Sequence, residues 1–176
     1  MNLYLSGIIG SGKTTIGERL AERLGLAFRD LDREMDARLG YSFHRLVSEQ
    51  GWLPFRELEY RIVKDFAATA EKEPAVVCLG GGTVRYEWNN DAVCGTGPVV
   101  LLKVPEEEVI RRVRLADRPR VHADTSLEED IHIMLEKHWD KYERAADLVF
   151  DCAGKTLQQE LDELEHLARS DPRFAG

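Results

Sequence analysis

The sequence predicts a single α/β domain in which a parallel sheet lies between two layers of helices. Two observations predict this fold. Helix signals separate five short apolar runs, and alternation of strands with helices is typical of doubly wound folds. The runs are continuous rather than alternating, as in parallel strands covered on both faces. They lie at residues 2–6, 27–30, 75–79, 98–104 and 148–151. The length of 176 residues fits one domain, and no repeat or linker divides it, so we treat residues 1–176 as one domain.

The helices are marked by apolar stripes and by start signals. Ile16, Leu20 and Leu24 share one side of the helix expected after the first strand. A long helix is expected around residues 55–66, where Phe55, Leu58, Ile62 and Phe66 form a stripe. Further helices should begin near Pro105, and at capping-box patterns formed by Ser126 with Glu129 and by Thr156 with Gln159.

Composition excludes several function classes. The formal net charge of −8 disfavours binding to nucleic acid or to an anionic membrane. The widely spaced Cys78, Cys94 and Cys152 predict reduced thiols rather than a zinc site. The first residues run directly into a predicted strand, and no apolar run approaches the roughly 20 residues that span a bilayer. We therefore expect a soluble, cytoplasmic protein.

A phosphate-binding loop is predicted at residues 7–14, which read Gly-Ile-Ile-Gly-Ser-Gly-Lys-Thr and match G-x-x-x-x-G-K-[ST]. The glycines keep side chains away from backbone N–H groups that can bind phosphate, Lys13 adds a positive charge, and the Thr14 hydroxyl can ligate Mg²⁺. A strand before the loop and a helix after it are the context that this motif requires. The nucleotide-binding residues are predicted to be Gly10, Ser11, Gly12, Lys13, Thr14 and Thr15.

Two acidic residues, Asp30 and Asp32, end the second predicted strand. Ligands of open α/β sheets bind beyond the carboxyl ends of the strands, so the pair should face the phosphate-binding loop. One carboxylate can help to hold Mg²⁺, and the other can accept a proton from an attacking hydroxyl. The alternative is that Asp32 only caps a helix beginning near Arg33.

Several further segments appear in the order found in one family. They are residues 28–32 (FRDLD), 40–42 (GYS), 55–59 (FRELE), 79–83 (LGGGT), 118–119 (RP) and 142–147 (YERAAD). Together with the phosphate-binding loop, this set resembles the shikimate kinase family over residues 3 to about 151.

The resemblance implies a P-loop kinase fold with a five-stranded parallel sheet of the nucleoside monophosphate kinase type. It implies an acceptor-binding region at about 31–60 and a mobile lid at about 112–125. The expected reaction transfers the γ-phosphoryl of ATP, bound with Mg²⁺, to the 3-hydroxyl of shikimate, in aromatic amino-acid synthesis. Asp32 would act at that hydroxyl, Asp30 would reach Mg²⁺, and Lys13 and the lid residue Arg118 would contact the phosphates. A monomer is expected.

Substrate-binding residues are assigned by combining this resemblance with residue chemistry. Arg56 can hold a carboxylate with Glu59 as its brace, although by itself the pair could be an ordinary surface ion pair. Gly80, Gly81 and Gly82 follow a buried strand and can form the floor of the acceptor site, the alternative being a tight turn.

Two positions depart from the family pattern. His138 stands where the family usually has a second carboxylate-binding arginine, four residues before Tyr142. It is either a core residue or a neutral donor in the acceptor site. Trp52 stands where an acidic residue is common, and it either fills hydrophobic space or reshapes the pocket. The departures leave open a kinase for a different small hydroxy acid or polyol, and a nucleotide-binding relative without catalysis is the third possibility.

Overall fold

The fold is a five-stranded parallel sheet, seen here in a computed structural model that describes residues 1–114, 125–170 and 172. The strand order is β2-β3-β1-β4-β5, and every neighbouring pair is parallel. The strands are β1 (Leu3–Ser6), β2 (Ala27–Asp30), β3 (Ala75–Cys78), β4 (Val99–Lys103) and β5 (Leu148–Asp151). The predicted α/β class is confirmed, although three of the strands are one or two residues shorter than the apolar runs that predict them.

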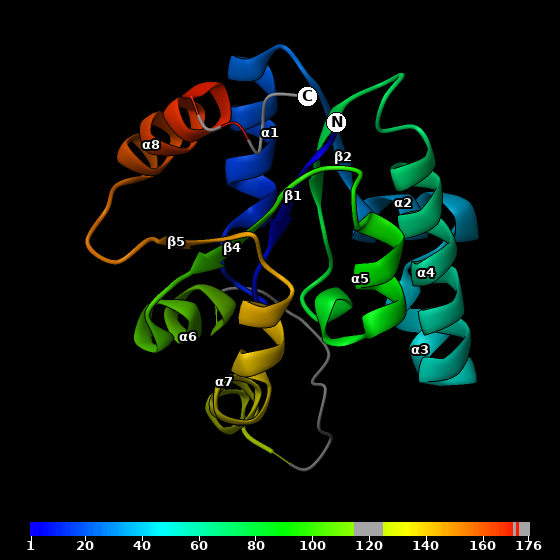
Figure 1. The fold of residues 1–176 in the computed structure, drawn as a ribbon. Coiled ribbons are helices and arrows are strands. Elements are labelled where there is room, and N and C mark those ends of the chain that lie inside the picture. The colour runs from blue at the N-terminus through cyan, green and yellow to red at the C-terminus, as the bar shows by residue number, and fades with distance from the viewer. Residues whose placement is uncertain (115–124, 171, 173–176) are drawn as a thin grey trace.

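Helices cover both faces of this sheet. Figure 1 shows α1 and α8 together on one side and α4 with α5 on the other, which makes the predicted three layers. The helices are α1 (Lys13–Leu24), α2 (Leu31–Leu39), α3 (Phe43–Gln50), α4 (Trp52–Ala68), α5 (Glu87–Val93), α6 (Glu106–Arg114), α7 (Leu127–Arg144) and α8 (Leu157–Ser170), with one 3₁₀ turn, η1 (Thr83–Arg85).

Local sequence signals set several helix ends. Ser126 accepts from the Glu129 N–H while the Glu129 carboxylate accepts from the Ser126 N–H, so the predicted capping box begins α7. Thr156 and Gln159 form the same reciprocal pair before α8. Pro105 stands directly before α6, whose first turn carries three glutamates.

The core forms where α1 packs closely on the sheet. Every residue of β1 and β3 is buried. A side-chain carbon on Gly17 would lie 2.6 Å from Cys78 Sγ and 2.8 Å from the Phe28 ring, so only glycine allows this approach. The close packing holds the amino end of α1 over the carboxyl ends of the strands.

The register of the sheet gathers the loops of the site at one edge. Leu5 and Asp30 both pair with Cys78 at the end of β3. The phosphate-binding loop after β1, Asp30 of β2 and the glycines after β3 therefore emerge side by side. In the part of the chain that the structure describes, no helix is long and apolar enough to cross a membrane.

Candidate active site

A cavity of about 640 Å³ opens at this edge of the sheet. Most of the residues predicted to bind ligands line it, and they come from loops and helices far apart in the sequence. The predicted residues found in its wall are Gly10, Gly12, Lys13, Thr14, Thr15, Asp30, Asp32, Arg56, Gly80, Gly81 and Gly82. Ser11, within the phosphate-binding loop, is fully buried and is not among the described lining residues. Arg118 and most of the predicted lid lie outside the described residues.

The phosphate-binding loop forms one end of the cavity. Gly10 and Gly12 have φ values of 78° and 89°, which favour glycine, and Gly12 directly precedes α1. Lys13 Nζ donates to the carbonyl oxygens of Gly7 and Ile8, at 2.7 and 3.0 Å. The loop therefore places an ammonium group and the amino end of a twelve-residue helix together, an arrangement that attracts anions.

Thr14 and Asp30 meet beside this loop. The Thr14 hydroxyl donates to Asp30 Oδ2 at 2.9 Å. Hydroxyl and carboxylate oxygens suit Mg²⁺, which keeps several waters and usually takes only one or two protein ligands. No group of three or more His, Cys, Asp or Glu residues that could hold a metal occurs within residues 1–114 and 125–170. Thr14 and Asp30 therefore offer the kind of oxygen ligands that would hold a magnesium ion.

The other Asp30 oxygen caps a helix. Asp30 Oδ1 accepts from the backbone N–H groups of Asp32 and Arg33, at 3.1 and 3.2 Å, and α2 begins directly at Leu31. The alternative in which Asp32 is the cap is therefore wrong. Asp32 lies in the first turn of α2 and in the cavity wall, where its Oδ1 is 3.3 Å from the position of a side-chain carbon on Gly80.

Arg56 is held by a buried carboxylate. Its Nη1 donates to both oxygens of Glu59, at 2.8 Å each, and the two side chains are only 12% and 1% exposed. The predicted brace is confirmed, and the surface-pair alternative is wrong. Glu59 also accepts from Thr83 Oγ1 at 2.8 Å and from Asn89 Nδ2 at 3.2 Å. No feature of the sequence indicates these two partners, which lie 24 and 30 residues away.

Close packing explains the glycine run. A side-chain carbon on Gly81 would lie 3.1 Å from the backbone nitrogen of Ile9 in the phosphate-binding loop. One on Gly82 would lie 2.7 Å from Arg85 Nη2. The Tyr142 hydroxyl donates to the carbonyl oxygen of Gly81 and ties the run to α7. The glycines are thus the point where the phosphate-binding loop and the arginines come together.

His138 and Trp52 differ in their relation to the cavity. Trp52 lines it, is 43% exposed, and stacks its ring near the Arg56 guanidinium, 5.4 Å from ring centre to Cζ. It is therefore part of the pocket wall and not only hydrophobic filling. His138 is half-buried, and it is not among the described residues that line the cavity. Arg85, which no motif of the sequence indicates, is one of the residues that line the cavity.

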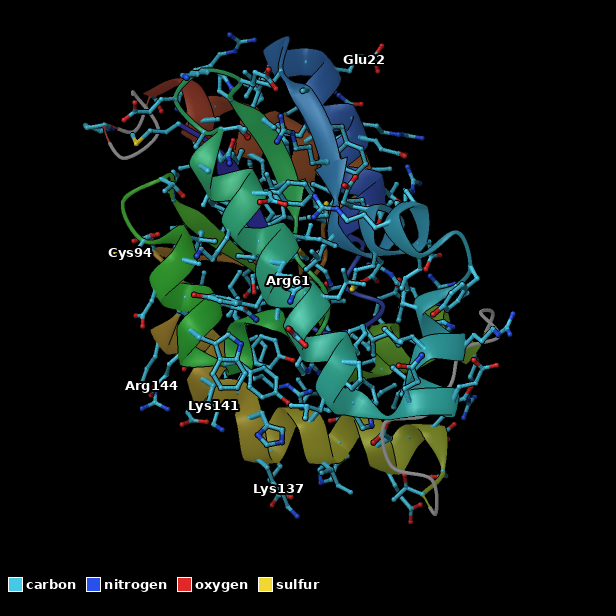
Figure 2. All side chains as sticks on the ribbon, turned by 90° about the vertical axis from the view of Figure 1, so that its right-hand side faces the viewer. Glu22, Arg61, Cys94, Lys137, Lys141 and Arg144 are labelled. Atoms are coloured by element: carbon cyan, nitrogen blue, oxygen red, sulfur yellow. The ribbon has the colours of Figure 1, made fainter. Side chains whose placement is uncertain are left out.

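The cysteines take no part in this site. All three are free; Cys78 and Cys152 are buried, and Cys94 lies at the surface (Figure 2). Burial raises the pKa of Cys78 and raises that of Cys152 to about 12. Both buried thiols therefore stay protonated and unreactive at neutral pH.

Comparisons with known proteins all point to one family. The family model for shikimate kinase matches residues 9–168. A shikimate kinase of Chlorobium luteolum is 36% identical over 183 residues, covering 98% of this chain and 89% of the relative. Shikimate kinase 1 of Escherichia coli is 28% identical and covers 97% of both chains. A solved shikimate kinase from Acinetobacter baumannii in complex with shikimate superposes with a TM-score of 0.87 at 26% identity, covering 97% of this chain and 93% of that one.

Proposed function

The chain belongs to the shikimate kinase family, and we propose that it transfers the γ-phosphoryl group of Mg²⁺-bound ATP to the 3-hydroxyl of shikimate. The choice of shikimate as the substrate rests on the relatives named above. The residues of this chain support the assignment independently, because one cavity holds a phosphate-binding end and a carboxylate-binding end.

The observation that carries the proposal is that the phosphate-binding loop and the two arginines come close to neighbouring glycines. A side-chain carbon on Gly81 would meet the phosphate-binding loop, while one on Gly82, the next residue, would meet the Arg56 and Arg85 guanidiniums. A small acid with its carboxylate at the arginines would thus place a hydroxyl near the phosphates. Positioning of this kind supplies most of the catalysis in phosphoryl transfer.

Asp32 is the group that acts at the attacking hydroxyl. It stands beside Gly80, and it is a half-buried carboxylate within the wall of the cavity that the loop and the arginines share. A carboxylate there accepts a hydrogen bond from the hydroxyl and orients the hydroxyl lone pair toward the γ-phosphorus. It receives the hydroxyl proton as the new oxygen–phosphorus bond forms and the bond between the γ-phosphorus and the departing ADP breaks.

The nucleotide is held by the loop and by the amino end of α1. Backbone N–H groups of residues 10–15 and the Lys13 ammonium bind the phosphate oxygens, and Arg118 is proposed to add positive charge at the phosphates. Thr14 and Asp30 would hold Mg²⁺, which when bound neutralises charge on the phosphates. The cytoplasmic location and the monomeric state stay predictions.

An assay of coupled ADP release tests the proposal. Purified protein is supplied with ATP, Mg²⁺ and, in separate reactions, shikimate, quinate, gluconate and no acceptor. ADP release only with shikimate, and at least tenfold above the acceptor-free rate, is the expected result. Turnover of another acid alone would favour the alternative kinase, which the histidine at position 138 motivates. Absence of turnover with every acid would favour the non-catalytic relative.

A further inference from the structure

We propose that Arg85, together with Arg56, forms the carboxylate-binding clamp of the acceptor site and supplies the charge that sets its preference for an acid. The inference rests on the proposed function, since it concerns the same acceptor. It assigns a residue at the end of a short 3₁₀ turn to the task for which the resemblance implied position 138.

The two guanidinium groups converge on one point. A side-chain carbon on Gly82 would lie 2.7 Å from Arg85 Nη2, 3.1 Å from Arg85 Nε and 3.2 Å from Arg56 Nη2. Both arginines also line the cavity. Two cationic groups therefore lie beside Gly82, and an anion additional to Glu59 would be attracted to both of them there.

Each arginine has an N–H donor without a hydrogen-bond partner in the described residues. Arg56 uses Nη1 for Glu59, while the Nε atoms of Arg56 and Arg85 are buried and have no hydrogen-bond partner in the described residues. Over those same residues, the Arg85 side chain makes no ion pair. A buried donor without a partner is unfavourable in a folded protein. The Nη2 atoms of both arginines lie beside Gly82, and they are the donors that an anion at this position would engage.

The charge balance shows why a second arginine is needed. Glu59 is 1% exposed and contacts Arg56 through both oxygens, so its negative charge offsets the charge of Arg56. Arg85 then provides the net positive charge at this end of the cavity. A carboxylate has two oxygens, and a planar guanidinium on each is a favourable geometry for recognising it.

Tyr142 connects the proposed clamp to α7. Its hydroxyl bonds to the Gly81 carbonyl, and burial raises its pKa, an effect that the nearby Arg85 and Arg56 charges partly oppose. His138 lies one turn earlier on α7 but is absent from the described lining of the cavity. Of the two positions, Arg85 of η1 is therefore the one that lines the described cavity.

The test compares Arg85→Met with a matched control, Arg61→Met. Arg61 is an exposed arginine on the outward side of α4, paired with Glu57 (Figure 2). Binding of shikimate and of its neutral carboxamide is measured by calorimetry, together with the KM values for shikimate and ATP. Thermal unfolding confirms that each variant is folded.

For Arg85→Met we expect a loss of about 10- to 100-fold in shikimate affinity, the effect of removing one charge-assisted contact. Affinity for the carboxamide and the KM for ATP should stay within about twofold. Arg61→Met should match the wild type. Arg85→Lys, which keeps the charge but lacks the fork, should lose less, and it carries the test if Arg85→Met does not fold.

Three outcomes would overturn the inference, and they are distinguishable. If the wild type phosphorylates shikimate and Arg85→Met binds it within twofold of the wild type, the clamp is wrong and the proposed function stands. The same holds if acid and carboxamide lose affinity equally, because Arg85 would then have only a structural role. If the wild type neither binds nor phosphorylates shikimate, the proposed function fails and the inference fails with it.

Discussion

Arg56 and Glu59 lie one helical turn apart on α4, and a single Arg56 nitrogen donates to both oxygens of a carboxylate that is almost completely buried. Thr83 and Asn89 donate to the same carboxylate from beyond the glycine run. Glu59 therefore fixes the direction of the Arg56 guanidinium and joins α4 to the segment that carries Arg85. The geometry of the acceptor end depends on this one buried group.

Glu59→Gln should weaken both the fold and the acceptor site. The change leaves a largely buried guanidinium without its countercharge, and breaking such a pair costs about 3 kcal/mol of unfolding free energy. We also expect about a tenfold higher KM for shikimate, since Arg56 loses its fixed orientation. Denaturant unfolding and steady-state kinetics measure the two effects. Glu57→Gln, which affects only an exposed pair, is the control, and equal behaviour of the two variants would contradict the role of Glu59.

Asp32→Asn should separate binding from chemistry. An amide of the same shape can still line the cavity, but it cannot take the proton of the attacking hydroxyl. We expect kcat to fall by about 100-fold or more while the Kd for ATP changes by less than about twofold. Asp140→Asn, at an exposed position of α7, should retain full activity. A parallel loss of ATP binding and turnover in Asp32→Asn would refute its assigned role.

Asp30→Asn should change the magnesium requirement more than the stability. Asparagine is as good a helix cap as aspartate, so α2 should keep its start and the melting temperature should change little. The carboxylate charge is lost, however, and the Mg²⁺ concentration for half-maximal activity should rise about tenfold. A magnesium titration of ADP release measures this shift. An unchanged titration curve would show that Asp30 serves only as the cap.

Tyr142→Phe should alter how stability depends on alkaline pH. Burial raises the pKa of Tyr142 to about 12 in the folded protein, above the value of about 10 in an unfolded chain. A raised pKa means that the stabilisation is complete below pH 10 and is lost as the pH rises toward 12. The variant lacks this loss, and it also lacks the bond to Gly81, which costs about 1 kcal/mol at pH 7. Denaturant unfolding at pH 7.5, 10 and 11.5 should show the wild type losing its advantage; a constant difference would contradict the shift.

The sequence predicts well where neighbouring residues determine structure. The phosphate-binding loop is one contiguous motif, the two capping boxes are pairs three residues apart, and β2 and β5 match their apolar runs. The Arg56–Glu59 brace was also accessible, because both residues lie on one helix at i, i+3 spacing.

The rest depends on contacts between distant segments. Asp30 rather than Asp32 caps α2 because the helix follows β2 without a loop, and the spacing of the two acids does not reveal that. Thr83, Asn89 and Arg85 join the site only because the turn after the glycines folds back against α4. Residue chemistry alone does not distinguish Arg85 from the many arginines that lie at the surface.

The most direct measurement of the central claim is phosphorus NMR of a reaction that contains the wild-type protein, Mg²⁺-bound ATP and shikimate. We predict that the γ-phosphate resonance declines while ADP resonances and one phosphate-monoester resonance grow at equal rates, with coupling that assigns the ester to the 3-oxygen of shikimate. Inorganic phosphate as the sole new product, or an ester that forms only when another acid replaces shikimate, would contradict the claim.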